Sequence, residues 1–145
     1  MVIRKGYSDD MFPIRNILLE MHSETTLSVP SIDMEKLTYH ILYALKHGHV
    51  FVAVLKNKII GTIGGFTTSD WWSEEKHLAD IWFYVSPDNR KSTAGRRLIK
   101  EFINVAKDAK MKLKLGHAYS GDIDRKDKFY ERLGFTKAGS LFTEA

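Results

Sequence analysis

The sequence contains no cysteine, only three prolines, and no apolar run that approaches the roughly 20 residues of a membrane-spanning helix. Without cysteine, the chain cannot form a disulfide, a thiolate zinc site or a cysteine nucleophile. Its first four residues, Met-Val-Ile-Arg, lack the charged and then apolar pattern of a secretory signal. The sequence therefore predicts a cytoplasmic protein that has no membrane segment.

The composition is that of an ordinary globular protein, with 43% hydrophobic and 28% charged residues in a length of 145. A chain of this length can bury a core of its own, so we expect residues 1–145 to form a single domain. The net charge is +4, and between residues 90 and 137 there are 14 Lys and Arg against 6 Asp and Glu. This excess favours an anionic ligand or partner, although a solvated basic surface would have the same composition.

The first half of the chain predicts a strand, two helices and a β-hairpin. The predicted elements are a strand at 1–7, helices at 9–21 and 33–46, a loop at 22–32 between them, and strands at 49–55 and 58–68. Ser8 is expected to cap the first helix, and Gly48 to end the second. Three glycines in the last strand, Gly61, Gly64 and Gly65, predict a bulge or a close backbone approach.

The rest of the chain is organised around residues 80–107. An aromatic and β-branched strand at 80–85 is followed by a turn at 86–89, a small, basic loop at 90–95 and a helix to 107. The apolar residues of that helix recur on one face: Leu98, Ile99, Phe102, Ile103 and Ala106. The first N–H groups of a helix have no partner within it, so a basic loop at a helix start predicts a phosphate-binding site.

The C-terminal residues complete a mixed sheet. We predict a strand at 112–118, a turn at 120–122, a helix at 125–133 between Asp124 as its cap and Gly134 as its end, and short strands at 135–138 and 140–142. The order is β-α-α-β-β-β-α-β-α-β-β. The helix between two strands implies a parallel crossover, and the hairpin implies antiparallel neighbours. The predicted class is α/β (α+β), with a mixed, mostly antiparallel sheet of 6–7 strands and helices on both faces.

Two motifs carry a resemblance to a known family. Residues 90–95, Arg-Lys-Ser-Thr-Ala-Gly, resemble the acetyl-CoA-binding segment of the GNAT acetyltransferases, whose pattern is Gln/Arg-x-x-Gly-x-Gly/Ala. Thr93 stands where that pattern has its first glycine. Residues 128–135 are similar to the late F-Y-x-x-x-G-F segment of the same family, in the same order along the chain. The resemblance implies a GNAT-like fold and one N-acetyltransferase domain over residues 1–145.

The resemblance also implies a reaction. A GNAT enzyme uses acetyl-CoA without a metal and transfers the acetyl group to a primary amine by direct attack, without an acyl-enzyme. An amine with a pKa near ~10.4 is mostly protonated at pH 7, so a base must take its proton. Asp80 is the predicted base or water organiser, Tyr130 the predicted general acid, and the Val85 N–H the predicted donor to the carbonyl oxygen. The alternatives are a surface Asp80 paired with a lysine, and Tyr130 as a core residue.

The resemblance assigns further residues to cofactor and acceptor. The residues predicted to bind acetyl-CoA are Val85, Arg90, Lys91, Ser92, Thr93, Ala94, Gly95 and Arg96. The loops at 22–32 and 68–76 are expected to border the acceptor site. In the second loop, an aromatic and acidic group suits a cationic amine; it consists of Trp71, Trp72, Glu74 and Glu75. The alternative for this group is contact with a partner subunit in a homodimer. The histidine spacings predict no metal site.

Three functions are compatible with these features. The first is an N-acetyltransferase acting on a primary amine, whether a small molecule, a protein or a tRNA-linked amine. The second is a non-catalytic, CoA-binding or regulatory protein of the same fold, weakened at Thr93. The third is a basic nucleic-acid-binding domain, which the lack of a stacking platform or a known nucleic-acid motif disfavours.

Overall fold

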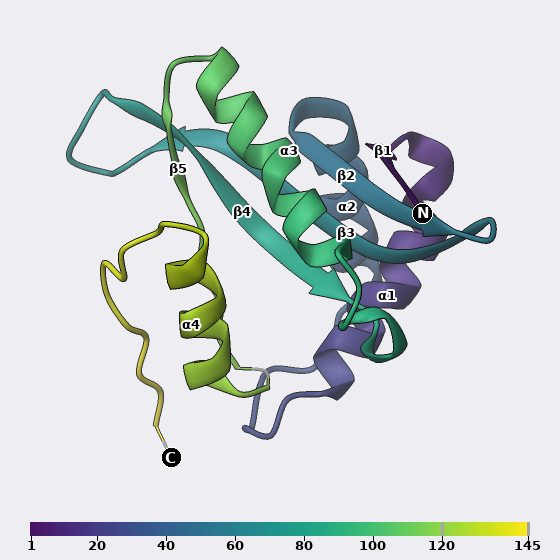
Figure 1. Cartoon of the computed structure of the whole chain (residues 1–145). Helices are drawn as coiled ribbons and strands as arrows, with labels where there is room; N and C mark the ends of the chain where they lie inside the picture. The colour runs from purple at the N-terminus through teal and green to yellow at the C-terminus, as the bar shows by residue number, and fades with distance from the viewer. Residues whose placement is uncertain (120, 145) are drawn as a thin grey trace.

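The computed structural model describes residues 1–119 and 121–144, and a five-stranded sheet lies at its centre (Figure 1). The strands are β1 (Val2–Lys5), β2 (His49–Leu55), β3 (Lys58–Ser69), β4 (Lys76–Val85) and β5 (Lys112–Lys114). They lie in the order β1-β2-β3-β4-β5; the first three pairings are antiparallel, and β4 pairs with β5 in parallel. The predicted hairpin, parallel crossover and mixed sheet are confirmed.

Helices cover both faces of the sheet, as predicted (Figure 1). The α-helices are α1 (Met11–Ser23), α2 (Met34–His47), α3 (Ala94–Asp108) and α4 (Ile123–Arg132), and short 3₁₀ turns occur at Ser8–Asp10 and Pro87–Asn89. Side chains of α1 and α2 form one core with the sheet, and α3 forms a second core on the opposite face. None of the described helices is long and apolar enough to cross a membrane.

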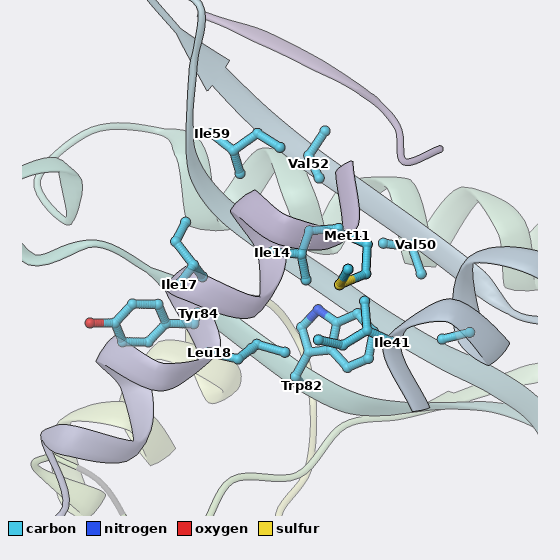
Figure 2. Packing of buried hydrophobic residues seen from close by; sticks show 11 residues of the cluster. Met11, Ile14, Ile17, Leu18, Ile41, Val50, Val52, Ile59, Trp82 and Tyr84 are labelled. Atoms are coloured by element: carbon cyan, nitrogen blue, oxygen red, sulfur yellow. The ribbon is translucent and has the colours of Figure 1, made fainter. Parts of the chain in front are cut away.

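The core beneath α1 and α2 holds the part of β4 that lies nearest to the candidate site (Figure 2). Ile14 of α1 and Ile41 of α2 are completely buried, and Trp82 of β4 packs in the same cluster. The indole Nε1 of Trp82 donates to Thr62 Oγ1 (3.1 Å), and the Thr62 hydroxyl donates to the Phe51 carbonyl (3.0 Å). Because these buried polar groups are paired, their hydrogen bonds offset the cost of desolvation and help to hold β4 in place.

The core beneath α3 fixes the start of that helix beside the end of β4. Leu98, Ile99 and Phe102 of α3 are completely buried against a cluster that includes Ile63 of β3 and Leu78 of β4. The apolar face predicted for this helix is therefore confirmed. Each such side chain contributes about 1.5–3 kcal/mol on burial, so the loop before α3 is anchored by a well-packed helix.

Two predicted helix caps are wrong. α1 begins at Met11 rather than at residue 9, because Ser8–Asp10 forms a 3₁₀ turn. The Asp10 carboxylate accepts the Tyr7 N–H (2.8 Å) and forms an ion pair with Arg4 (2.8 Å), which holds that turn. In α4 the cap is Asp122, whose Oδ1 accepts the Arg125 N–H at 3.1 Å, rather than Asp124. Residues 122 and 124 are both Asp, so composition alone cannot tell which of them caps α4, and the backbone path decides it. Gly48, by contrast, is the C-cap of α2 as predicted.

The strands predicted at 135–138 and 140–142 are also wrong, which leaves five strands in the described residues rather than 6–7. Leu141 and Phe142 are 66% and 89% exposed, so little burial would hold this segment against a sheet edge. β5 is shorter than predicted and ends at Lys114. The turn predicted at 120–122 includes Ser120, which lies outside the described residues.

A β-bulge interrupts the pairing of β3 with β4, as the glycines of β3 predict. Gly64 pairs with Trp82 and Gly65 pairs with Asp80, which leaves Ile81 as the extra residue on β4. A Cβ atom on Gly65 would lie 2.0 Å from the Ala79 carbonyl oxygen, so only glycine fits there. A bulge re-aims the neighbouring side chains, and here those side chains belong to Asp80 and Trp82.

We expect Gly65→Ala to lower the free energy of unfolding by about 1–3 kcal/mol, because the Ala79 carbonyl cannot yield without moving the bulge. Gly139→Ala is the matched control, since a Cβ atom there meets no atom within 4 Å. Urea unfolding of both variants checks the prediction, and equal midpoints for the two would contradict it.

Candidate active site

The candidate site begins where β4 and β5 separate. Their parallel pairing runs from His77 opposite Lys112 to Ala79 opposite Lys114. Beyond that point β4 continues to Val85, whereas residues 115–119 leave the sheet. We call the opening between residues 80–85 and residues 115–119 the fork. The bulge at Ile81 lies directly at its base.

Asp80 lies at the base of the fork. Its Oδ1 accepts the backbone N–H of Gly116 at 3.0 Å, from the opposite arm of the fork. Burial raises the pKa of Asp80 from 3.8 to about 6, and the N–H groups of Gly116 and of Asp80 itself oppose that rise only in part. A carboxylate with such a pKa is ionised at neutral pH and still binds a proton readily, which suits a general base.

Tyr130 of α4 packs against the 115–119 arm of the fork. Its ring stacks on the imidazole of His117, with centroids 5.7 Å apart and planes 12° apart, and meets Phe129 and Phe135 edge-on. Burial, and secondly the charge of Asp80, raise the pKa of the Tyr130 phenol above its usual value of 10.0. The phenol therefore keeps its proton throughout the neutral pH range, and a nearby carboxylate is part of the reason.

A polar cluster that no sequence motif predicted lies beside Tyr130. His117 Nε2 lies 2.8 Å from Asp127 Oδ1, and Asp127 Oδ2 lies 2.9 Å from Lys137 Nζ. Lys137, and then His117, hold the pKa of Asp127 below its usual value. Among the described residues, the buried His117 Nδ1 has no hydrogen-bond partner. These residues meet because α4 folds back against residues 115–119, and no motif in the sequence marks that contact.

The backbone of Val85 is oriented by the sheet. The Ser86 N–H donates to the Ile60 carbonyl of β3 at 2.8 Å. Since hydrogen-bonded and non-hydrogen-bonded pairs alternate in an antiparallel ladder, the neighbouring Val85–Gly61 pair is a non-hydrogen-bonded one. The Val85 N–H consequently points away from β3, toward the side on which β5 has separated from β4. This is the direction that a donor to a ligand in the fork requires.

Arg90 contacts protein groups on both sides of the site. Its guanidinium lies 2.6 and 2.8 Å from the two carboxylate oxygens of Glu24, at the end of α1, and its Nε donates to the Val85 carbonyl at 2.9 Å. It also lies over the Tyr84 ring, at 5.1 Å from the centroid. Arg90 thus joins the end of α1 to the end of β4, a role that the sequence did not indicate. Its predicted contact with a cofactor stays a prediction.

Residues 91–93 lead into α3, and residues 94–96 form the start of that helix. The Ser92 hydroxyl donates to the Asn89 carbonyl (2.6 Å) and accepts the Ala94 N–H (3.2 Å). Thr93 has φ −82° and ψ 4°, a backbone conformation that does not require glycine, and its side chain is exposed and makes no capping hydrogen bond. Lys91 and Arg96 are exposed beside it, and the first turn of α3 carries no acidic residue. Gly95 packs near Phe83: a Cβ atom added to Gly95 would lie 3.3 Å from Cζ of the Phe83 ring.

The aromatic and acidic group predicted to border the acceptor lies elsewhere. Trp71 is 96% exposed and Trp72 70% exposed, and both, together with Glu74 and Glu75, lie in the loop that joins β3 to β4. Figure 1 shows this loop at the end of the sheet away from the α1–α2 connection. The structure therefore does not bring these residues to the fork, and their acceptor role stays a prediction.

An apolar pocket of about 340 Å³ does lie at the fork, between the helices and the bulge. Leu18 of α1, Ile41 of α2, and Ile81 and Trp82 of β4 line it. The α1–α2 connection, predicted to border an acceptor, covers it, and the Thr25 hydroxyl joins that connection to the Tyr119 carbonyl across the fork. A larger hollow of about 720 Å³ lies near Lys76 and Lys112, and neither Asp80 nor Tyr130 lines it.

Comparisons with known proteins identify the type of domain and the fold. The acetyltransferase (GNAT) domain profile matches residues 46–137. A predicted acetyltransferase from Clostridium acetobutylicum, solved with acetyl-CoA, has a TM-score of 0.80 at 17% identity, over 99% of this chain and 95% of that one. AAC(6')-Iy with the bisubstrate analogue CoA-S-monomethyl-acetylneamine has a TM-score of 0.79 at 13% identity, over 99% and 96%.

A third solved structure extends the range of acceptors among these folds. The ribosomal-protein-alanine N-acetyltransferase from Brucella melitensis has a TM-score of 0.72 at 14% identity, over 100% of this chain and 99% of that one. At such identities the structural matches are evidence about the fold. A comparison with curated proteins gives no match.

Proposed function

The chain belongs to the GNAT acetyltransferase family, and on that premise we propose that it is an acetyl-CoA-dependent N-acetyltransferase acting on a primary amine by direct attack. We propose further that residues 1–145 act as one N-acetyltransferase domain, since both cores pack on a single sheet. The proposal is supported mainly by the groups that the structure brings together at the fork. There a carboxylate with a raised pKa and an outward-pointing backbone N–H, both on β4, meet a protonated phenol on α4.

The start of α3 fits the pyrophosphate of CoA. The Ala94 N–H already donates to the Ser92 hydroxyl, and the N–H groups that follow it in the first turn form an anion site. Neither an acidic residue in the first turn nor an unfavourable dihedral at Thr93 opposes an anion. Lys91 and Arg96 add positive charge there. Bound at this place, acetyl-CoA would supply the activated acetyl thioester.

The residues of the fork then divide the proton transfers between them. Asp80 takes the proton from the amine, directly or through one water, as the amine nitrogen bonds to the thioester carbon. The Val85 N–H donates to the carbonyl oxygen on which negative charge develops. Tyr130 gives its phenolic proton to the sulfur as the C–S bond breaks, which avoids release of a free thiolate. The proton bound by Asp80 is returned to solvent, and Tyr130 recovers one from it.

Release of free CoA from acetyl-CoA, followed with a thiol reagent over a panel of amines, tests the function. We expect amine-dependent thiol release that saturates with both substrates. Stabilisation by acetyl-CoA in a thermal-shift measurement, without any thiol release, would instead favour a non-catalytic CoA-binding protein. If acetyl-CoA neither stabilises the protein nor is consumed, the proposal fails.

Two cations on α3 provide a matched test of the cofactor site. Arg96 lies in the first turn of the helix, and Lys107 lies in the last. We expect Arg96→Ala to weaken CoA binding by about two- to fivefold, because a charge at a helix terminus or surface contributes roughly 0.3–1 kcal/mol. Lys107→Ala should leave the affinity unchanged.

Calorimetric titration with CoA measures both affinities, and the Arg96 effect should shrink as salt is raised from 50 to 500 mM, since salt screens exposed charges. An equal effect of the two substitutions would place the pyrophosphate elsewhere.

A further inference from the structure

We propose that the apolar pocket at the fork binds the acceptor, and that the acceptor is a small primary amine carried on an apolar body, such as an alkyl or phenylalkyl group. This inference rests on the proposed function and specifies its substrate. The pocket, of about 340 Å³, is at the small end of the range for ligand sites, ~300–1,000 Å³. The occupant is therefore a small molecule rather than a folded protein.

The position of the pocket links it to the chemistry. Ile81 and Trp82, which line it, directly follow Asp80 on β4, and Ala118 and Tyr119 line it from the other arm of the fork. The residues on either side of the bulged Ile81 have different surroundings: Asp80 reaches the Gly116 N–H, whereas Trp82 joins the core of α1 and α2. A body held in the pocket would thus present its amine at the base of the fork, beside Asp80.

The part of the pocket lining that the structure describes carries no carboxylate that could bind a polycation. Among the described residues that line it there is no Asp, Glu, Lys or Arg; its polar side chains are those of His22, Thr25, His40 and Tyr119, and the indole N–H of the lining Trp82 is paired with Thr62. The carboxylates nearby are already paired, since Glu20 accepts from the Tyr84 hydroxyl at 3.0 Å and Glu24 binds Arg90. A polyamine or an aminosugar would lose the hydration of several charges or hydroxyls here and gain no counter-charge from the described lining of the pocket in return.

The apolar lining of the pocket also assists the reaction of an apolar amine. An ammonium group moved from water to an apolar surrounding loses hydration, and its pKa falls. The proton is then transferred more readily to Asp80, so the pocket favours the neutral amine that the attack requires. Burial of the body supplies the binding energy, and the amine itself needs no carboxylate other than Asp80.

A homologous series tests the inference with the full-length protein in the presence of saturating CoA. Calorimetric titration with butylamine, pentylamine and hexylamine should give a Kd that falls about fourfold for each added methylene group. Spermidine, which carries several charges, should bind at least tenfold more weakly than hexylamine. A Kd that does not change along the series, or a tighter Kd for spermidine, overturns the inference.

A substitution at the pocket wall sharpens the test. Ile81 is 56% exposed on the bulge, so Ile81→Glu should fold, and its carboxylate should weaken hexylamine binding at least tenfold and strengthen spermidine binding. Val2→Glu is the matched control, because Val2 is 59% exposed on β1. Equal hexylamine affinities for the two variants would contradict the inference.

Turnover separates this inference from the proposed function. If the alkylamines bind with the expected dependence on length and yet no CoA is released from acetyl-CoA, the pocket is as inferred and the enzymatic function fails. If CoA is released with spermidine or with a peptide α-amine, and the alkylamine series shows no dependence on length, the function stands and the inference about the acceptor fails.

Discussion

Replacing Tyr130 with phenylalanine should lower kcat by about 10²–10⁴-fold, the range that a positioned general acid or base contributes. The phenol is held protonated by burial and by the charge of Asp80, so it can donate to the departing sulfur at any pH near neutrality. Phenylalanine keeps the ring that stacks on His117 and removes only the proton donor. Thiol release under saturating acetyl-CoA measures the effect.

The control for this substitution is Tyr39→Phe on α2, whose ring is 61% exposed. It removes a phenol as well and should leave kcat within twofold of the unsubstituted protein. Thermal unfolding of both variants verifies that the fold is kept. If Tyr130→Phe turned over at the original rate from pH 6 to pH 9, the thiolate would leave without help, and Tyr130 would be a structural residue.

Asp80→Asn should have two opposite effects, a loss of activity and a gain of stability. Without a base, we expect kcat/KM at pH 7 to fall by about 10²-fold or more. In the unsubstituted protein, kcat/KM should decline below a pH of about 6, as Asp80 becomes protonated, and this decline should vanish in the variant. Asparagine keeps an oxygen that can accept the Gly116 N–H, so the local geometry is preserved.

The gain of stability follows from the direction of the pKa shift. Burial makes the ionised form of Asp80 unfavourable in the folded state, where its pKa is about 6, against 3.8 in the unfolded chain. The cost is absent below pH 3.8, grows as the pH rises from 3.8 to about 6, and is complete above that value. The difference between the two pKa values corresponds to about 3 kcal/mol, an upper estimate of what Asp80→Asn recovers.

Thermal unfolding at two pH values measures this gain. The Tm of Asp80→Asn should exceed that of the unsubstituted protein by several degrees at pH 8 and should nearly equal it at pH 4. Asp9→Asn, at an exposed carboxylate in the N-terminal 3₁₀ turn, is the control and should show no such dependence on pH. An Asp80→Asn variant that is less stable at pH 8 would mean that the carboxylate is stabilised by the fold, which does not suit a base.

The predictions for Asp80 and for the cofactor-binding residues had different grounds. The resemblance implied a role for Asp80, and Asp80 is also the one carboxylate in the strand at 80–85, where burial raises the pKa of a carboxyl group. The loop residues were chosen by motif alone. For Arg90 the motif indicated a cofactor contact, whereas the structure shows contacts with Glu24 and Val85. Glu24 lies 66 residues before Arg90 in the chain, and Val85 lies five residues before it.

The errors at the C-terminus have a common cause. Short strands were predicted at 135–138 and 140–142 on either side of Gly139, but a strand also needs an edge to pair with and a face to bury. With Leu141 and Phe142 exposed, the described tail has neither. Composition cannot reveal this, because the availability of an edge depends on where β5 ends and where α4 packs.

The sequence by itself determined the elements whose pattern is local: the apolar face of α3, the hairpin of β2 and β3, the bulge glycines, and the two motifs that identify the family. These depend on residues a few positions apart, where spacing and backbone freedom decide the outcome. Only the tertiary structure decided the chemistry of the site. The separation of β4 from β5, the His117–Asp127 pair and the uncharged pocket all join residues distant in the chain, and packing alone brings them together.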